Sequence, residues 1–335
     1  RTLPDFRFGY QVGNRIWVLH QPEDYYNRHL LLHEGAHAIT DHLFGGGGPP
    51  WFMEGTAEWM STHLWQPPTS PLESSQVTIG IVPESSGAAQ GWGRIELIGD
   101  ARRHKRVPSL ESVMKYNDAA HREVEPYAWS WLAATLLEMY PDYRRVRREA
   151  AVHAADRSPQ FNSNVYAKLR TQWPILSARW NLLAHDIDYG WDSSHQMIDL
   201  PTSLDPLGSE VQMNLNASHG WQSAPIKLSG GQSVKITSAG RYKIRESTRD
   251  WYSESDGITI HYYQGQPIGK LIARLLPMSP VSGGPYVTPP EDFAIGASGV
   301  ITASQESWLL LKVNEAPGEY ADNEGELAIE LDPVR

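Results

Sequence analysis

The chain has no cysteine, and this absence excludes several kinds of chemistry at once. Without thiols there is no disulfide framework, cysteine-ligated zinc, iron–sulfur cluster or thiol nucleophile. No apolar run approaches the ~18 residues that a membrane-spanning helix needs, so we expect no such span. The formal net charge of −10 argues against nucleic acid as a partner, because phosphate backbones attract Lys and Arg. Any metal ion must therefore be held by His, Asp, Glu or Asn.

The 335 residues are enough for about two domains. A segment with two prolines near Leu200 is typical of a linker. We therefore predict a first domain over 1–198, a linker over 199–206 and a second domain over 207–335. Because Arg1 is not an initiating Met, we expect that a signal peptide was removed or the chain was trimmed. That expectation favours a secreted, periplasmic or cell-surface protein.

Hydrophobic patterning differs between the two predicted domains. The first domain is predicted to be mainly helical, with a short strand over 15–19 near its start. The pattern of the second domain predicts short strands between Gly, Pro, Asn and Asp turns. The predicted helices are 27–44, 51–65, 127–140, 141–155, 161–173 and 174–185. The predicted strands of the second domain are 225–228, 233–237, 241–244, 257–263, 271–275, 300–302, 308–313 and 326–331. The fold class is therefore multidomain α+β, a helical domain followed by an all-β sandwich.

The sharpest motif is His33-Glu34-Gly35-Ala36-His37. Two His at i and i+4 lie on one helix face, so both imidazoles can reach one zinc ion. Glu34 beside them can take a proton from the water that the metal activates. Gly35 weakens a helix, and we expect it where another backbone or a substrate approaches closely. The alternative is that the two His are unrelated helix residues and Glu34 is solvated.

A catalytic zinc keeps three protein ligands and one open position, so a third ligand must come from a neighbouring element. The helix after the glycine loop carries Glu54 and Glu58 on one face. Glu54 is the better third ligand. Glu58, one turn further on, suits a residue that orients a ligating His. The alternative for Glu58 is an ordinary solvated carboxylate.

These two motifs together resemble the gluzincins, zinc metallopeptidases of the peptidase-MA-like group. The likeness rests on residues 33–37 and on Trp51-Phe52-Met53-Glu54-Gly55-Thr56-Ala57-Glu58, and it covers roughly residues 15–140. It implies a zincin-like catalytic domain, Glu54 as the third zinc ligand, and hydrolysis of protein or peptide substrates.

The mechanism that the resemblance implies is metal-assisted hydrolysis with Glu34 as general base. The oxyanion needs a further donor, and Tyr127 is the candidate, because similar families carry a Tyr-x-x-Ser element downstream. The alternative is a structural tyrosine at a helix start. Three single histidines are other possible donors, although such residues are more often structural: His63, His104 and His121.

The second domain contains a turn-rich stretch of oxygen ligands over 314–325, of a kind that suits Ca²⁺. An acidic surface loop is the alternative from spacing alone. The stretch resembles the calcium-dependent galactose-binding lectins of the small bacterial β-sandwich type, over most of 205–335. This resemblance implies glycan binding.

The same resemblance points to four residues as calcium ligands. Glu315 stands where the lectins have a ligating Asp, and Glu319 would offer its backbone carbonyl. Asp322 and Asn323 would supply side-chain or backbone oxygens.

Together these features predict a zinc metallopeptidase with an accessory carbohydrate- or surface-binding sandwich. Two alternatives remain open at the level of sequence. One is a glycan-binding protein with a degenerate peptidase half, and the other is a zinc amidase that acts on non-protein amides.

Overall fold

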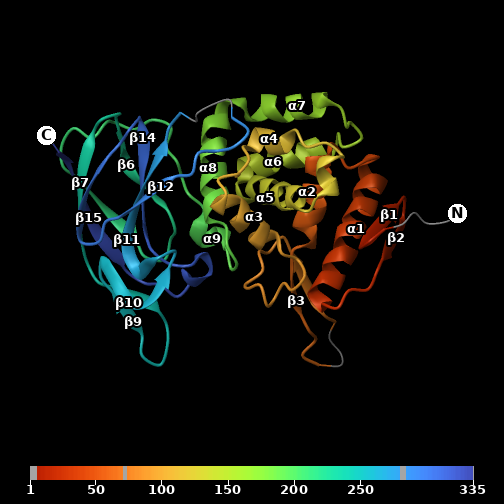
Figure 1. Ribbon diagram of the computed structural model, residues 1–335, viewed down its shortest axis with the longest axis horizontal. Coiled ribbons are helices and arrows are strands. Elements are labelled where there is room, and N and C mark those ends of the chain that lie inside the picture. The colour runs from red at the N-terminus through yellow and green to blue at the C-terminus, as the bar shows by residue number, and fades with distance from the viewer. Residues whose placement is uncertain (1–5, 71–73, 280–283, 335) are drawn as a thin grey trace. The chain divides into compact units, whose positions relative to one another are not determined.

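The computed structural model describes residues 6–70, 74–279 and 284–334. It contains both helices and sheets, and it divides into two compact units (Figure 1). The first comprises the described residues up to Trp173 together with 284–287, and the second comprises 174–279 and 288–334. The predicted multidomain α+β class is thus confirmed. No helix in the described residues has the length and apolar character that a membrane crossing requires.

The first unit is mainly helical, with two small hairpins. Its helices are α1 (Asp24–Phe44), α2 (Pro50–Ser61), α3 (Arg94–Arg103), α4 (Leu110–Met114), α5 (Glu125–Met139), α6 (Pro141–Ala151) and α7 (Pro159–Leu169), with 3₁₀ turns η1 (Ala120–Arg122) and η2 (Arg170–Gln172). Its strands are β1 (Gly9–Val12), β2 (Arg15–Val18), β3 (His63–Gln66) and β4 (Gln76–Ile79). In Figure 1 the hairpin of β1 and β2 lies alongside α1.

Helix α2 lies at the centre of this unit, in contact with both α1 and α5. Gly45 ends α1 with a left-handed φ of 73°, and its N–H donates to the Asp41 carbonyl over 2.9 Å. This turn lets α2 begin at Pro50 after a short loop. A Cβ placed on Gly55 of α2 would lie 2.4 Å from the Ser130 carbonyl oxygen of α5. The close approach of α2 to α5 therefore depends on a residue without a side chain.

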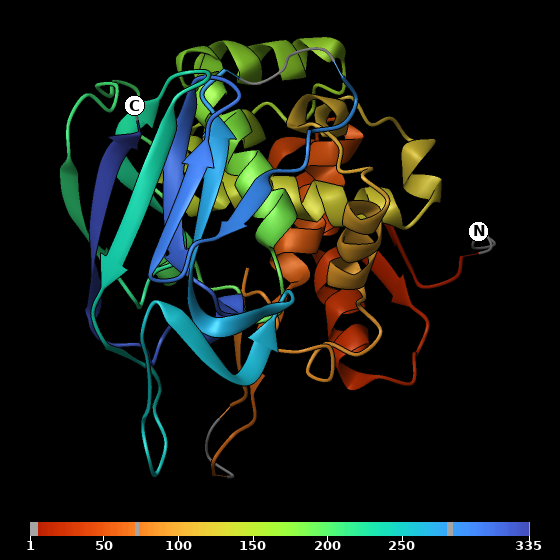
Figure 2. The same ribbon diagram turned by 60° about the vertical axis from the view of Figure 1, so that its left-hand side comes forward.

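The second unit is an antiparallel sandwich with helices α8 (Trp173–Asp186) and α9 (Ser193–Gln196). One sheet has the strand order β10-β11-β14-β6, with β12 also paired to β11, and the other has the order β13-β7-β15-β5. Both sheets contribute to one apolar core, and Figure 2 shows the strands from a second side. The strands are β5 (Val211–Asn216), β6 (Gln222–Leu228), β7 (Ser233–Ala239), β8 (Tyr242–Arg245), β9 (Trp251–Ser253), β10 (Asp256–Tyr263), β11 (Gln266–Pro277), β12 (Glu291–Ala294), β13 (Ser298–Thr302), β14 (Ser307–Val313) and β15 (Glu326–Val334), with the turn η3 (Pro317–Glu319).

Strand β14 is buried along its whole length because both of its faces are covered. Leu309 and Leu311 point into the core between the sheets. Trp308 and Leu310 point to the other face, where Leu182 of α8 packs against them. Its sequence is therefore a nearly continuous apolar run rather than an alternating one.

This packing explains why the units divide after Trp173 and not at the predicted linker over 199–206. The sequence of α8 has the same helical pattern as the helices before it. Its Ala178 and Leu182 side chains, however, are buried in the core of the second unit. The predicted helix over 51–65 also ends earlier, at Ser61. Trp65 lies instead in β3, opposite Val77 of β4.

The two helical glycines beside the glutamates should respond oppositely to alanine. Nothing lies within 4 Å of a Cβ on Gly35, so the close approach expected there is found at Gly55 instead. We expect Gly55→Ala to lower the free energy of unfolding by about 1–3 kcal/mol through overpacking. Gly35→Ala should raise it by up to about 1 kcal/mol through helix propensity. Denaturant unfolding of both variants tests this, and a stabilised Gly55→Ala would contradict the packing described.

Candidate metal centre

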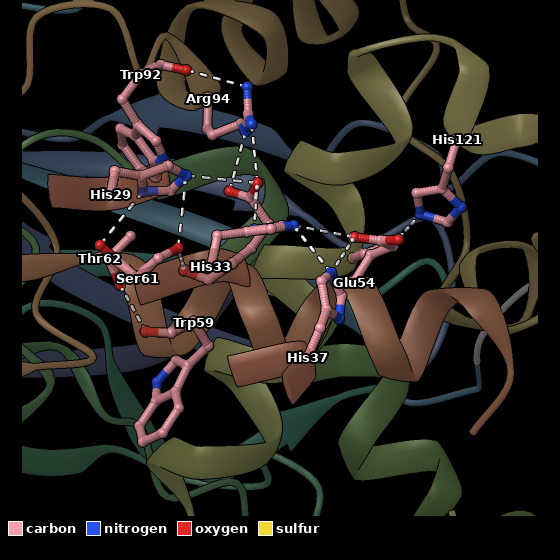
Figure 3. Close-up of polar contacts among 12 residues, drawn as sticks. His29, His33, His37, Glu54, Trp59, Ser61, Thr62, Trp92, Arg94 and His121 are labelled. Carbon is pink, nitrogen blue, oxygen red and sulfur yellow. Dashed lines mark hydrogen bonds and ion pairs between the residues drawn. The ribbon is translucent and has the colours of Figure 1, made fainter. Parts of the chain in front are cut away.

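Two imidazoles of α1 face one another. His33 and His37 are one helical turn apart, and their Nε2 atoms are separated by 3.1 Å. Figure 3 shows both rings directed toward Glu54. The i, i+4 spacing read from the sequence therefore brings two nitrogen ligands to one point.

Helix α2 supplies the third group at the same point. Glu54 Oε2 lies 3.3 Å from His33 Nε2 and 3.4 Å from His37 Nε2. Zinc bonds to N and O are about 2.0–2.1 Å long, so ligand atoms at the corners of a tetrahedron around it lie roughly 3.3–3.4 Å apart. Glu54 Oε2 is buried and accepts no hydrogen bond from the described residues. The three atoms thus have the chemistry and spacing of three corners of a tetrahedral zinc site.

The carboxylate of Glu34 opens into a pocket of about 340 Å³ beside these groups. Strand β1 passes close to it, since a Cβ on Gly9 would lie 2.4 Å from Glu34 Oε1. Burial raises the pKa of Glu34, which suits a group that must both accept and return a proton. The pocket is lined by Gly9, Tyr10, Gln11, His33, Glu34, His37, Thr40, Asp41, Gly47, Met53, Glu54 and Tyr127.

Glu58 lies on the other side of the His33 ring from Glu54 and is held by Arg94 of α3. Arg94 Nη2 donates to Glu58 Oε1 over 2.8 Å, and its Nε donates to Oε2 over 3.1 Å. Glu58 Oε1 in turn lies 3.4 Å from His33 Nδ1. Burial by itself would raise the pKa of Glu58, but the Arg94 charge brings that pKa well below its ordinary value. Glu58 is therefore a buried anion aimed at the outer nitrogen of His33.

The same glutamate belongs to a second cluster, with His29 and His33, that resembles a metal set in composition. His29 Nε2 lies 3.6 Å from Glu58 Oε1. Both oxygens of Glu58 already accept hydrogen bonds from a buried guanidinium, however, and a cation there repels a second one. Arg94 thus makes this cluster a support for His33 rather than a second metal site.

Tyr127 lines the pocket, with its ring centroid 6.2 Å from that of His33. Burial raises the pKa of its hydroxyl, so it remains an O–H donor at neutral pH. His121 Nε2 lies 3.1 Å from the Ser130 Oγ, and the His121 ring packs against that of Tyr127 with 4.9 Å between centroids. Two more of the alternative donors are absent from the pocket lining: His63 and His104.

Two parts of the site were not found by sequence reasoning. Arg94 gave no signal, because an arginine near a helix start is ordinary and its partner lies 36 residues away. Strand β1 did carry a signal, since Gly13 and Asn14 form the two-residue turn of a hairpin with Val12 opposite Arg15. The prediction included only the second strand of that hairpin.

In the second unit the structure brings together two of the four predicted calcium ligands. Asn323 Nδ2 donates to Glu315 Oε2 over 2.7 Å, and Glu315 Oε1 and Asn323 Oδ1 are buried without a described hydrogen-bond partner. The carboxylates of the other two residues have protein partners, and these contacts do not involve the Glu319 backbone carbonyl, which is the oxygen expected to bind calcium. Glu319 pairs with Arg245, and Asp322 accepts from the backbone N–H of residue 246.

No family model matches the sequence, and no curated protein matches it. Solved structures that match include a PllA-like lectin, the EclA N-terminal domain, at 17% identity over 37% of this chain and 95% of that one, with a TM-score of 0.28. PliG, a periplasmic inhibitor of g-type lysozyme from Aeromonas hydrophila, matches at 7% identity over 42% of this chain and 99% of that one, with a TM-score of 0.22. IMPa from Pseudomonas aeruginosa, in complex with an O-glycopeptide, matches at 11% identity, with a TM-score of 0.20. The match covers 84% of this chain and 27% of that one. At these TM-scores the similarities carry no argument about fold or function.

Proposed function

We propose that the first unit is a zinc-dependent metallopeptidase. The observation that carries the proposal is the spacing of 3.1–3.4 Å among the Nε2 atoms of His33 and His37 and Oε2 of Glu54. Glu34 opens into the same pocket, where a general base is needed. A degenerate peptidase half would not be expected to keep all four groups in one place.

When bound, zinc polarises the scissile carbonyl and lowers the pKa of a water molecule. Glu34 accepts the proton of the attacking water and then passes it to the leaving amine. The Tyr127 hydroxyl donates to the oxyanion that develops on the carbonyl. Glu58 holds the outer nitrogen of His33, and through it the orientation of that imidazole.

Strand β1 favours a peptide over other amide substrates. It pairs with β2 in a two-stranded sheet, and its residues Gly9, Tyr10 and Gln11 line the pocket. The backbone of such a strand can hydrogen-bond with an extended chain. A zinc amidase that acts on non-protein amides does not need a strand that can pair with an extended peptide.

Replacing the general base should separate metal binding from turnover. We expect Glu34→Gln to bind one zinc per chain, because the three ligands are intact, and to lose about 10²–10⁴-fold in kcat. Metal analysis and a mixed peptide library with and without chelator provide the measurements. Glu111→Gln, on the exposed surface of α4, is the matched control and should behave as the original protein. A zinc-free preparation, or an undiminished kcat in Glu34→Gln, would overturn the proposal.

Removing Arg94 should weaken zinc binding through Glu58 and His33. We expect Arg94→Met to raise the Kd for zinc about 10–100-fold, measured by competition with a chelator. Arg147→Met is the matched control, because Arg147 is also buried in the first unit and paired with a glutamate, Glu138. It should lose stability but keep its zinc affinity. An equal loss of affinity in both variants would mean that Arg94 acts only through stability.

For the second unit we propose calcium and glycan binding, supported by the motif over 314–325 and by the free oxygens of Glu315 and Asn323. Burial, helped by Glu319 and Asp322, raises the pKa of Glu315 to about 8. With calcium removed, the folded protein keeps this proton at pH values where the unfolded chain has released it.

The contribution of Glu315 to the stability of the calcium-free protein should therefore be complete below the ordinary carboxyl pKa and be lost as the pH rises toward 8. The slope from this one group is at most about 1.4 kcal/mol per pH unit. Thermal unfolding in the presence of chelator measures this slope, and Glu315→Gln should flatten it. Added Ca²⁺ should restore the stability of the original protein at high pH, but not that of the variant. An unchanged slope in Glu315→Gln would contradict the assignment of the slope to Glu315. If Ca²⁺ does not stabilise the original protein, the proposed calcium site is wrong.

A further inference from the structure

The charged residues that line the pocket are unbalanced. Three carboxylates contribute to the described lining, those of Glu34, Asp41 and Glu54, and no Lys or Arg does. Glu34 and Glu54 have roles in the proposed chemistry. Asp41 has none, and it needs a separate explanation.

Asp41 lies on the same face of α1 as Glu34. Seven residues separate the two, which is two helical turns and about 10.5 Å along the axis. This distance corresponds to about three residues of an extended peptide. A substrate held across Glu34 would thus pass Asp41 within a few residues of the bond that is cut.

Nothing in the described protein uses the Asp41 side chain. The side chain forms no ion pair and no hydrogen bond with the described residues, whereas the Asp41 backbone carbonyl accepts from the N–H of Gly45. Asp41 also lies in the last turn of α1, where a negative charge faces the negative end of the helix dipole and lowers helix stability. An aspartate that lowers the stability of its own helix and faces a pocket is better explained by a role in binding whatever enters that pocket.

We propose that the cleft selects substrates with a cationic side chain, Lys or Arg, two or three residues from the scissile bond, and that Asp41 is the residue that recognises it. The inference rests on the proposed peptidase function and names its substrate class. An ion pair with the exposed Asp41 at the mouth of the pocket supports a preference of about two- to fivefold, which high salt should weaken.

Matched fluorogenic peptides test the inference. One series carries Arg at each of the three positions on either side of the scissile bond, and the other carries citrulline, which keeps the shape without the charge. At low salt we expect the original protein to cleave one Arg peptide about two- to fivefold better than its citrulline counterpart, measured as kcat/KM, with the difference mainly in KM. Asp41→Asn should remove the preference, so that this variant cleaves matched Arg and citrulline peptides equally well. Asp41→Lys should reverse it toward Glu peptides.

A second measurement does not depend on turnover. Binding of the preferred Arg peptide to the Glu34→Gln protein, followed by fluorescence anisotropy, should weaken about two- to fivefold when Asp41→Asn is added. The matched control is Glu111→Gln, which removes an exposed carboxylate of the same unit outside the pocket lining. It should leave both preference and affinity unchanged.

The possible failures are distinguishable. Cleavage that ignores the Arg-to-citrulline change, or a preference that survives Asp41→Asn, overturns the role of Asp41 and leaves the peptidase proposal standing. A zinc-loaded protein that cleaves no peptide overturns the peptidase proposal, and the inference with it.

Discussion

The close approach of α2 to α5 is the constraint on which the first unit depends. Gly55 allows it, because any side chain there would meet the Ser130 carbonyl oxygen. With α2 held at this depth, Glu54 reaches the imidazoles of α1 and Glu58 reaches Arg94 of α3. One glycine without a side chain thus sets the position of two carboxylates on either side of His33.

Buried ion pairs recur in both units and have a common physical character. Arg94 with Glu58 and Arg274 with Asp186 each join elements that are distant in sequence, and Arg147 with Glu138 joins the consecutive helices α5 and α6. Such pairs cost desolvation energy and are stable only when the hydrogen bonds are nearly complete, so they favour one arrangement of the helices over others. In the first unit this selectivity acts at the candidate metal centre, because Arg94 holds both oxygens of Glu58 where Oε1 lies 3.4 Å from His33 Nδ1.

Local sequence signals predicted the elements whose structure is decided locally. Helix α1 follows from its capping glycine and apolar spacing, and the strands of the sandwich follow from alternation between turns. Trp65 was assigned to a helix because nothing local shows that residues 63–66 pair with 76–79, a contact made across a loop. Helix α8 was assigned to the wrong side of a boundary because an amphipathic helix does not reveal which core it covers. The four calcium ligands stay a prediction, and only the tertiary structure shows that the side chains of Glu319 and Asp322 also contact Arg245 and the backbone N–H of residue 246.

The sequence by itself determined that two imidazoles and a carboxylate share one short stretch of helix, because residues one turn apart must lie together on any α-helix. It also predicted which glutamate could complete the set. Only the tertiary structure decided that Glu54 approaches to within 3.4 Å, that Arg94 supports Glu58, and that Asp41 opens into the same pocket as Glu34. These facts depend on how separate helices and the β1–β2 hairpin pack against one another. The periodicity of a single segment does not predict that packing, because it shows only which face of the segment is buried.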